Sequence, residues 1–203
     1  MILLAIFGSP REKGNTDLML ESFLEGASSV QDIQVERVFV RELKISGCLG
    51  CGFCDEHGMC VQSDDMEGVY PLFDTADRIV IASPIYFYGL PGQIKLLIDR
   101  SQAPFMRKLK GIETDLPPGV PPAGRKGFFL SAGATRGKRL FECGILTVRY
   151  FFDALDVAYA GELCFREMDE KGAINGHPTA LEECRKAGKA FVSERQSSVS
   201  DEQ

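Results

Sequence analysis

Short apolar runs alternate with amphipathic segments along the chain, and this alternation constrains the fold more than any other feature. The first run, "MILLAIF", ends at Gly8 and Pro10, as a buried parallel strand does. Residues 16–28 then place apolar side chains at helical spacing, with Asn15 or Thr16 as the expected N-cap. The expected strands are 1–7, 33–43, 78–83, 126–133 and 156–165, and the expected helices are 16–28, 64–76, 91–102, 139–155 and 180–195.

Strands that alternate with helices predict βαβ units, a parallel sheet and helices on both of its faces. Five strands in 203 residues fit an α/β, doubly wound, flavodoxin-like sheet of order 2-1-3-4-5. We expect residues 1–195 to form a single domain and residues 196–203 to be a disordered tail. Two long loops are expected, a cysteine-rich one at 46–62 after the second strand and a proline- and glycine-rich one at 104–124.

Composition excludes several classes of protein. The net charge is −6, and the basic residues concentrate only in "RKLK" at 107–110, so we expect no nucleic-acid partner. The longest uncharged stretch, 79–94, is interrupted by prolines and glycines, so no membrane span is expected. The apolar N-terminus lacks a basic n-region and a cleavage site, which favours a strand over a signal peptide. A cytoplasmic protein is therefore expected, where clustered cysteines indicate metal binding or redox chemistry.

The loop after the first strand, residues 8–16, has the composition of a phosphate site. Ligands of open α/β sheets bind beyond the carboxyl ends of the strands. This loop opens a helix, whose N–H groups and dipole attract an anion. Ser9, Asn15 and Thr16 add donors, and Arg11 adds a positive charge. The pyrophosphate fingerprint G-x-G-x-x-G is absent, so a phosphomonoester fits better; the alternative is an ordinary βα turn.

The loop after the third strand, residues 83–95, carries three consecutive aromatic residues, Tyr86, Phe87 and Tyr88. At the end of a sheet strand they are placed to pack against a flat ligand, and backbone N–H groups could meet the polar edge of its ring. The alternative is that they seal the end of the sheet or lie in a subunit interface, where aromatic residues are enriched.

Four cysteines, Cys48, Cys51, Cys54 and Cys60, fall within thirteen positions. Two-residue gaps and intervening glycines allow the first three to wrap around one 4Fe-4S cluster, and the five-residue gap allows the fourth to return to it. Zinc is the main alternative, although structural zinc sites usually use two separated Cys-x-x-Cys pairs. Free thiols that take part in disulfide chemistry are a third possibility.

Three segments then point to a known group of proteins. They are "GSPREKGNTD" after the first strand, "SPIYFYGLPGQIKLLIDR" after the third and "SAGA" after the fourth. Together they resemble the NAD(P)H-dependent FMN reductase group of flavodoxin-like proteins. With the cysteine run added, the chain resembles the iron–sulfur flavoprotein family from residue 1 to about residue 192.

The resemblance implies FMN as a cofactor and assigns residues to it. The matching segments are Ser9, Arg11, Asn15 and Thr16 for the phosphate, Pro84, Ile85, Tyr86, Phe87, Tyr88 and Gly89 for the isoalloxazine, and Ser131, Ala132 and Gly133 as a third flavin-facing loop. It also implies that the four cysteines are the ligands of one 4Fe-4S cluster, and that the protein is a homodimer or a dimer of dimers. The segment 104–124 matches nothing in the family.

The function expected from these features is an FMN-dependent oxidoreductase with one 4Fe-4S cluster. It would exchange single electrons with a carrier such as ferredoxin and pass them through FMN to a small acceptor, with no catalytic side chain because the chemistry belongs to the cofactors. One alternative is a cluster-free NAD(P)H-dependent FMN or quinone reductase whose cysteines bind zinc or stay free. Another is a non-catalytic flavodoxin-like sensor or binding module.

Overall fold

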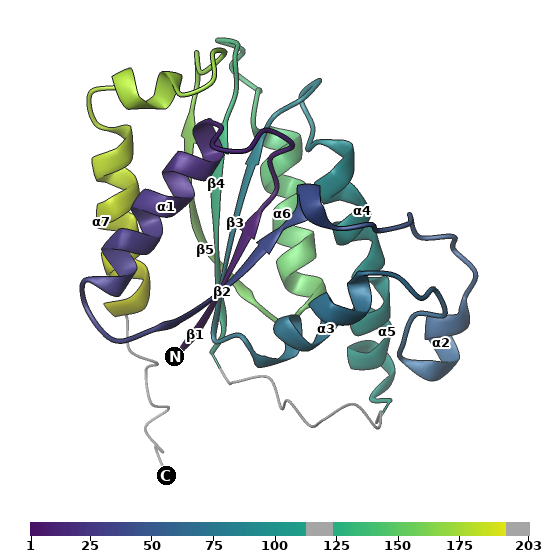
Figure 1. Ribbon diagram of the computed structural model, residues 1–203. Helices are drawn as coiled ribbons and strands as arrows, with labels where there is room; N and C mark the ends of the chain where they lie inside the picture. Colours follow the sequence, from purple (N-terminus) through teal and green to yellow (C-terminus); the bar gives the residue numbers. More distant parts are fainter. Residues whose placement is uncertain (113–123, 194–203) are drawn as a thin grey trace.

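A five-stranded parallel sheet forms the centre of the computed structural model, which describes residues 1–112 and 124–193 (Figure 1). The strand order β2-β1-β3-β4-β5 confirms the predicted order, and all four pairings are parallel. The strands are β1 (Ile2–Phe7), β2 (Gln34–Phe39), β3 (Arg78–Pro84), β4 (Lys126–Ala132) and β5 (Ala158–Phe165). The order of the chain reverses direction between β1 and β3, which is where ligands of such sheets bind.

Helices cover both faces of the sheet. Helices α1 and α7 lie on one face, and α3, α4 and α6 lie on the other (Figure 1). The helices are α1 (Asn15–Ser28), α2 (Phe53–His57), α3 (Met66–Thr75), α4 (Gly92–Arg100), α5 (Gln102–Lys110), α6 (Glu142–Ala154) and α7 (Ala180–Ser193), with 3-10 turns η1 (Val40–Glu42) and η2 (Ala173–Gly176). No helix of the described ranges is both long and apolar enough to cross a membrane.

The continuous apolar run of β1 is explained by burial on both sides. Leu3 and Phe7 pack into the core beneath α1 and α7, while Leu4 and Ile6 pack into the core beneath α3, α4 and α6. Successive side chains of a strand point to opposite faces, so a central strand of a three-layer domain has no polar position. The predicted strands 1–7, 78–83, 126–133 and 156–165 are confirmed within two residues at each end, and the edge strands β2 and β5 are buried only in part.

Three local predictions are wrong. Residues 104–110, expected to be a loop, belong to α5, because Pro104 lies in the first helical turn, where the missing N–H breaks no hydrogen bond. The N-cap of α1 is Gly14 rather than Asn15 or Thr16, which are the first residues of the helix. The strand expected over 33–43 ends at Phe39 and continues as a 3-10 turn. Residues 113–123 of the expected loop and the expected tail 196–203 lie outside the described residues.

Helices α1 and α7 approach to backbone contact through two glycines. A Cβ atom added at Gly26 would lie 2.0 Å from the carbonyl oxygen of Arg185, and one added at Gly188 would lie 1.9 Å from the carbonyl oxygen of Phe23. Real Cβ atoms do not approach so closely, so these positions have no room for a side chain. Helix α7 therefore packs against α1 through close backbone contact, which depends on the absence of side chains at these two glycines.

We expect Gly188→Ala to lower the free energy of unfolding by about 1–3 kcal/mol, because the helices must separate to admit the methyl group. Urea denaturation followed by circular dichroism measures this. Gly68→Ala in α3 is the matched control, because nothing lies within 4 Å of its added Cβ. It should stabilise the protein by up to about 1 kcal/mol through helix propensity. Equal effects at both positions would contradict the close packing of α1 and α7.

Candidate functional site

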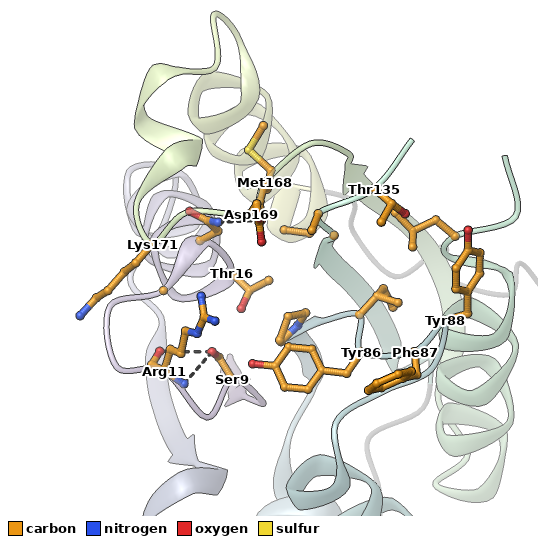
Figure 2. A pocket seen from close by; sticks show the side chains of 18 residues that line it. Ser9, Arg11, Thr16, Tyr86, Phe87, Tyr88, Thr135, Met168, Asp169 and Lys171 are labelled. Carbon is orange, nitrogen blue, oxygen red and sulfur yellow. Dashed lines mark hydrogen bonds between the residues drawn. The ribbon is translucent and has the colours of Figure 1, made fainter. Parts of the chain in front are cut away.

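A cavity of about 440 Å³ lies at the carboxyl edge of the sheet, between the loops that follow β1, β3, β4 and β5. Figure 2 shows the loop with Ser9 and Arg11 on one side and the three aromatic residues on the other. The predicted residues that line the cavity are Ser9, Arg11, Asn15, Thr16, Pro84, Ile85, Tyr86, Phe87, Tyr88, Ala132 and Gly133. Three segments distant in the sequence are thus brought together around one space, as the position of the strand ends predicts.

The loop after β1 presents a compact polar surface to this cavity. The Oγ of Ser9 accepts the Arg11 backbone N–H at 3.1 Å, which holds the turn closed. Thr16 is 1% exposed, and its Oγ1 has no hydrogen-bond partner in the part of the chain that the structure describes. A buried hydroxyl without a partner is costly. Its place in the cavity wall, in the first turn of α1, suits an anionic ligand.

The side chain of Asn15, which also lines the cavity, is hydrogen-bonded within the chain. Its side-chain amide donates to the carbonyl oxygens of Met168 (3.2 Å) and Glu170 (2.9 Å), and its Oδ1 accepts the N–H of Ile174 (3.2 Å). All of these partners follow β5. The amide is therefore occupied in fixing the loop after β5 against the start of α1, and it shapes the cavity wall rather than offering free donors.

The aromatic loop after β3 is a tight turn with a strained backbone. Tyr86 and Gly89 exchange two backbone hydrogen bonds of 2.9 Å, which close the turn between them. Phe87 and Tyr88 at its tip have φ angles of 49° and 62°, in the left-handed region that bulky residues avoid. Phe87 is fully exposed, so its ring gains no burial energy that would offset the cost of the strained backbone. Such strain gathers at ligand-binding and switch segments.

Two predicted residues do not line the cavity. Ser131 is completely buried, and its Oγ donates to the carbonyl oxygen of Ser83 at 2.8 Å, which ties β4 to β3. Gly89 closes the aromatic turn. The residues that line the cavity and were missed are Gly14, Ala134, Thr135, Leu140, Met168, Asp169 and Lys171. Three of these residues follow β5. Their residue types do not mark them as ligand-binding, but their position beyond the carboxyl end of a strand could have identified them.

The four cysteines line a second cavity of about 470 Å³, which shares no lining residue with the first. Gly50, Gly52 and Gly58 have φ angles of 62°, 76° and 65°, so the loop turns sharply between the thiols. Cys48 and Cys51 are exposed, and Cys54 and Cys60 are half-buried. Within the described ranges, no three His, Cys, Asp or Glu side chains gather closely enough to hold a single metal ion.

The thiols of this loop affect one another. Burial raises the pKa of Cys54, and the negative charges of Asp55, Cys48 and Cys60 raise it further. His57 is turned to another partner, because its ring stacks on Phe53 at 4.0 Å and its Nδ1 lies 3.0 Å from the Phe53 carbonyl oxygen. His57 is therefore not directed at the thiols, whereas Asp55 and Asp99 line the cavity with them, and a bound cationic centre would relieve the repulsion between these anionic groups.

The fold and the first cavity define a flavodoxin-like α/β protein with a ligand site at the switch point of its sheet. Residues 1–140 match the family model described as NADPH-dependent FMN reductase. An iron–sulfur flavoprotein of Methanocaldococcus jannaschii is 30% identical over 156 residues, which cover 75% of this chain and 71% of that protein. The chain belongs to the NADPH-dependent FMN reductase family and, within it, to the iron–sulfur flavoproteins.

Further comparisons agree with this. An iron–sulfur flavoprotein of Archaeoglobus fulgidus is 39% identical over 100 residues, 49% of this chain and 45% of that protein. Matches to several such relatives span about half of their length. Among solved structures, an NAD(P)H:quinone oxidoreductase from Methanothermobacter marburgensis superposes with a TM-score of 0.66 at 15% identity, over 97% of this chain and 98% of that one. At this identity the likeness shows the fold.

We expect Phe87→Gly to raise the free energy of unfolding by up to about 1 kcal/mol, because glycine relieves the left-handed backbone at the tip of the turn. Tyr150→Gly is the control, since it also removes an exposed aromatic ring, but from inside α6, where glycine is unfavourable. It should destabilise the protein. Denaturant midpoints compared in the absence of ligand give the sign of each effect, and destabilisation by both substitutions would show that the turn is not strained.

Proposed function

We propose that this protein is an FMN-dependent oxidoreductase that binds FMN in the first cavity and one 4Fe-4S cluster among the four cysteines, with a one-electron carrier such as ferredoxin as its partner. The observation that carries the proposal is the presence of two separate cavities, one at the sheet switch point and one lined by four thiols. We further propose that residues 1–195 form a single FMN-binding domain, which the packing of α7 on α1 supports.

The first cavity suits a flavin mononucleotide in its chemistry. The first turn of α1, the unpartnered Thr16 hydroxyl and the Arg11 side chain offer donors and positive charge for a terminal phosphate. The aromatic turn lies across the cavity from them, and its apolar rings provide a surface for a flat ring system (Figure 2). The arrangement thus separates a polar end from an aromatic end, as the two ends of FMN require.

The second cavity suits a cluster better than a zinc ion. Zinc in structural sites is held by four ligands at about 2.3 Å for sulfur, so its thiols converge tightly. Here the four cysteines form a single compact run with Cys-x2-Cys-x2-Cys-x5-Cys spacing rather than two separated pairs, and they line one cavity of about 470 Å³. A cubane cluster occupies a volume of its own and takes one thiolate at each iron. Gly50 and Gly52, both with left-handed φ angles, line this cavity between the thiols.

The side chains and backbone of the protein position the cofactors and tune their properties, and they do not themselves react. When bound, FMN supplies hydride and one-electron transfer and the cluster supplies single-electron transfer. The loop after β1 binds the phosphate, the aromatic turn orients the ring, and Asn15 fixes the remaining wall of the cavity. Exposed Leu49 and Val61 beside the cysteines offer an apolar surface at which a small carrier protein can approach the cluster.

The experiment that tests the proposal is an anaerobic visible spectrum of freshly purified protein, combined with analysis of iron, sulfide, zinc and FMN. We expect about one FMN and about four irons per chain. Bound FMN with zinc or without metal, together with steady-state oxidation of NAD(P)H, would instead establish the simpler FMN or quinone reductase. Bound FMN without turnover with any donor would indicate a sensor or binding module.

We expect Thr16→Val to weaken FMN binding about tenfold or more, because a hydrogen bond from a buried hydroxyl to a charged phosphate contributes about 1.5–3 kcal/mol. Fluorescence titration of the apoprotein with FMN measures the change. Thr147→Val is the control, since its hydroxyl bonds the Cys143 carbonyl oxygen on α6, outside the cavity. Unchanged affinity in Thr16→Val would place the phosphate elsewhere.

We expect Cys51→Ala to remove iron while FMN stays bound, because the two cavities share no residue. Cys143→Ala is the matched control, since Cys143 is an exposed thiol on α6 that lines neither cavity. Its iron and FMN contents should equal those of the wild type. Loss of flavin together with iron in Cys51→Ala would contradict the separation of the sites.

A further inference from the structure

Arg100, the last residue of α4, is a buried cation beside the cysteine loop. Its side chain is fully enclosed, and the residue lines the same cavity as the four cysteines. In Figure 1 the segment that carries α2 projects beside α5, the helix that begins two residues after Arg100. A buried guanidinium is costly unless its charge and its N–H groups are satisfied, so its partners indicate what it is for.

Those partners lie at the two ends of the cysteine loop. One guanidinium nitrogen donates to the Ser46 carbonyl oxygen at 3.0 Å and to Asp64 Oδ2 at 2.6 Å, and the other terminal nitrogen donates to the Gln62 carbonyl oxygen at 3.3 Å. Ser46 lies two residues before Cys48, and Gln62 lies two residues after Cys60. The planar fork of one arginine thus joins the entry and the exit of the loop.

Asp64 adds further hydrogen bonds that join the two ends of the cysteine loop. Its Oδ2 also accepts the Ser46 N–H at 2.9 Å, and its Oδ1 accepts the Met66 N–H at 3.1 Å. The side chain of Gln62 donates to the Gly47 carbonyl oxygen at 3.1 Å. Loop ends that are 18 residues apart are therefore tied by several hydrogen bonds that converge on one ion pair.

The charge of Arg100 also reaches the thiols. An arginine side chain stays protonated at any physiological pH, and this one lines the same cavity as Cys60. The Nε–H of the guanidinium has no partner within residues 1–112 and 124–193. The arginine thus remains charged beside Cys60 and keeps one donor that the loop does not use.

We propose that Arg100 is a positioning residue for the metal cluster, which closes the cysteine loop and holds a buried positive charge beside Cys60 that raises the midpoint potential of the cluster. This inference rests on the proposed cluster. Reduction adds one negative charge to a centre that already carries four thiolates, and a nearby buried cation stabilises the reduced form more than the oxidised one. Screening by water is weak at an enclosed side chain.

The test is a potentiometric titration of the cluster, followed by electron paramagnetic resonance, on wild-type protein and variants. In Arg100→Gln we expect the ratio of reduced to oxidised cluster at the wild-type midpoint potential to fall about tenfold, which is about 59 mV for a one-electron couple. Arg100→Lys should keep most of the potential, because the charge remains. It should lose iron to a chelator faster than the wild type, because an ammonium cannot span three acceptors.

Two further variants make the result decisive. Arg37→Gln removes the same charge from an exposed arginine that pairs with Glu21, and it should leave potential and iron content unchanged. Asp64→Asn removes the counter-charge of Arg100 and should shift the potential in the opposite direction, toward easier reduction. FMN content and the melting curve report on folding in each variant, because the flavin cavity uses other residues.

Wild-type potential and wild-type iron retention in Arg100→Gln would overturn the inference. If Arg100→Gln does not fold, Asp64→Asn decides, and an unchanged potential there would also overturn it. Wild-type protein without iron would remove the proposed cluster itself and the inference with it. Wild-type protein with four irons and an indifferent Arg100→Gln would remove only the inference, so the two failures are distinguishable.

Discussion

Burial of β1 between two helical layers is the constraint on which the rest of the structure depends. Its side chains alternate between two apolar cores, so neither face of the strand can be exposed. The neighbouring strands are parallel, so their connections cross over through helices and four loops lie at one edge of the sheet. The ligand cavity is the space between those loops. At the opposite edge, buried Arg125 donates to the carbonyl oxygens of Ala76 and Leu155, which seals the ends of α3 and α6.

Strain and electrostatics are concentrated where the packing of the sheet ends. In the described ranges, most of the non-glycine residues with positive φ lie in loops around the first cavity: Lys13, Phe87, Tyr88 and Glu167, with Asp156 apart from them. The cysteine loop, by contrast, contains left-handed glycines and is held by a buried ion pair. One site is thus built from loops that rigid strands position, and the other from a loop whose ends are tied by the Arg100–Asp64 ion pair and the hydrogen bonds around it.

The sequence allowed the strands, their order and most of the lining of the first cavity to be predicted, because apolar runs and strand ends are local signals. It did not predict α5, since Pro104 reads as a helix breaker unless the start of the helix is known. The loop after β5 was missed because its residues resemble any surface turn, and only the position of the sheet places Met168 and Lys171 at the cavity. Arg100 lies 54 residues from Ser46, and no local pattern encodes such a pairing.

Helix α4 joins the two sites in a way that loops could not. It starts at Gly92, three residues after the aromatic turn closes at Gly89, and its last two residues, Asp99 and Arg100, line the second cavity, so it connects the aromatic loop of the first cavity to the wall of the second. Nine residues of α-helix span about 13 Å and do not stretch. The helix therefore fixes the separation of the two cavities within the chain at a constant length. Evolution can vary either loop without altering this spacing, whereas an insertion or deletion inside α4 would change the distance and the relative rotation of both sites together.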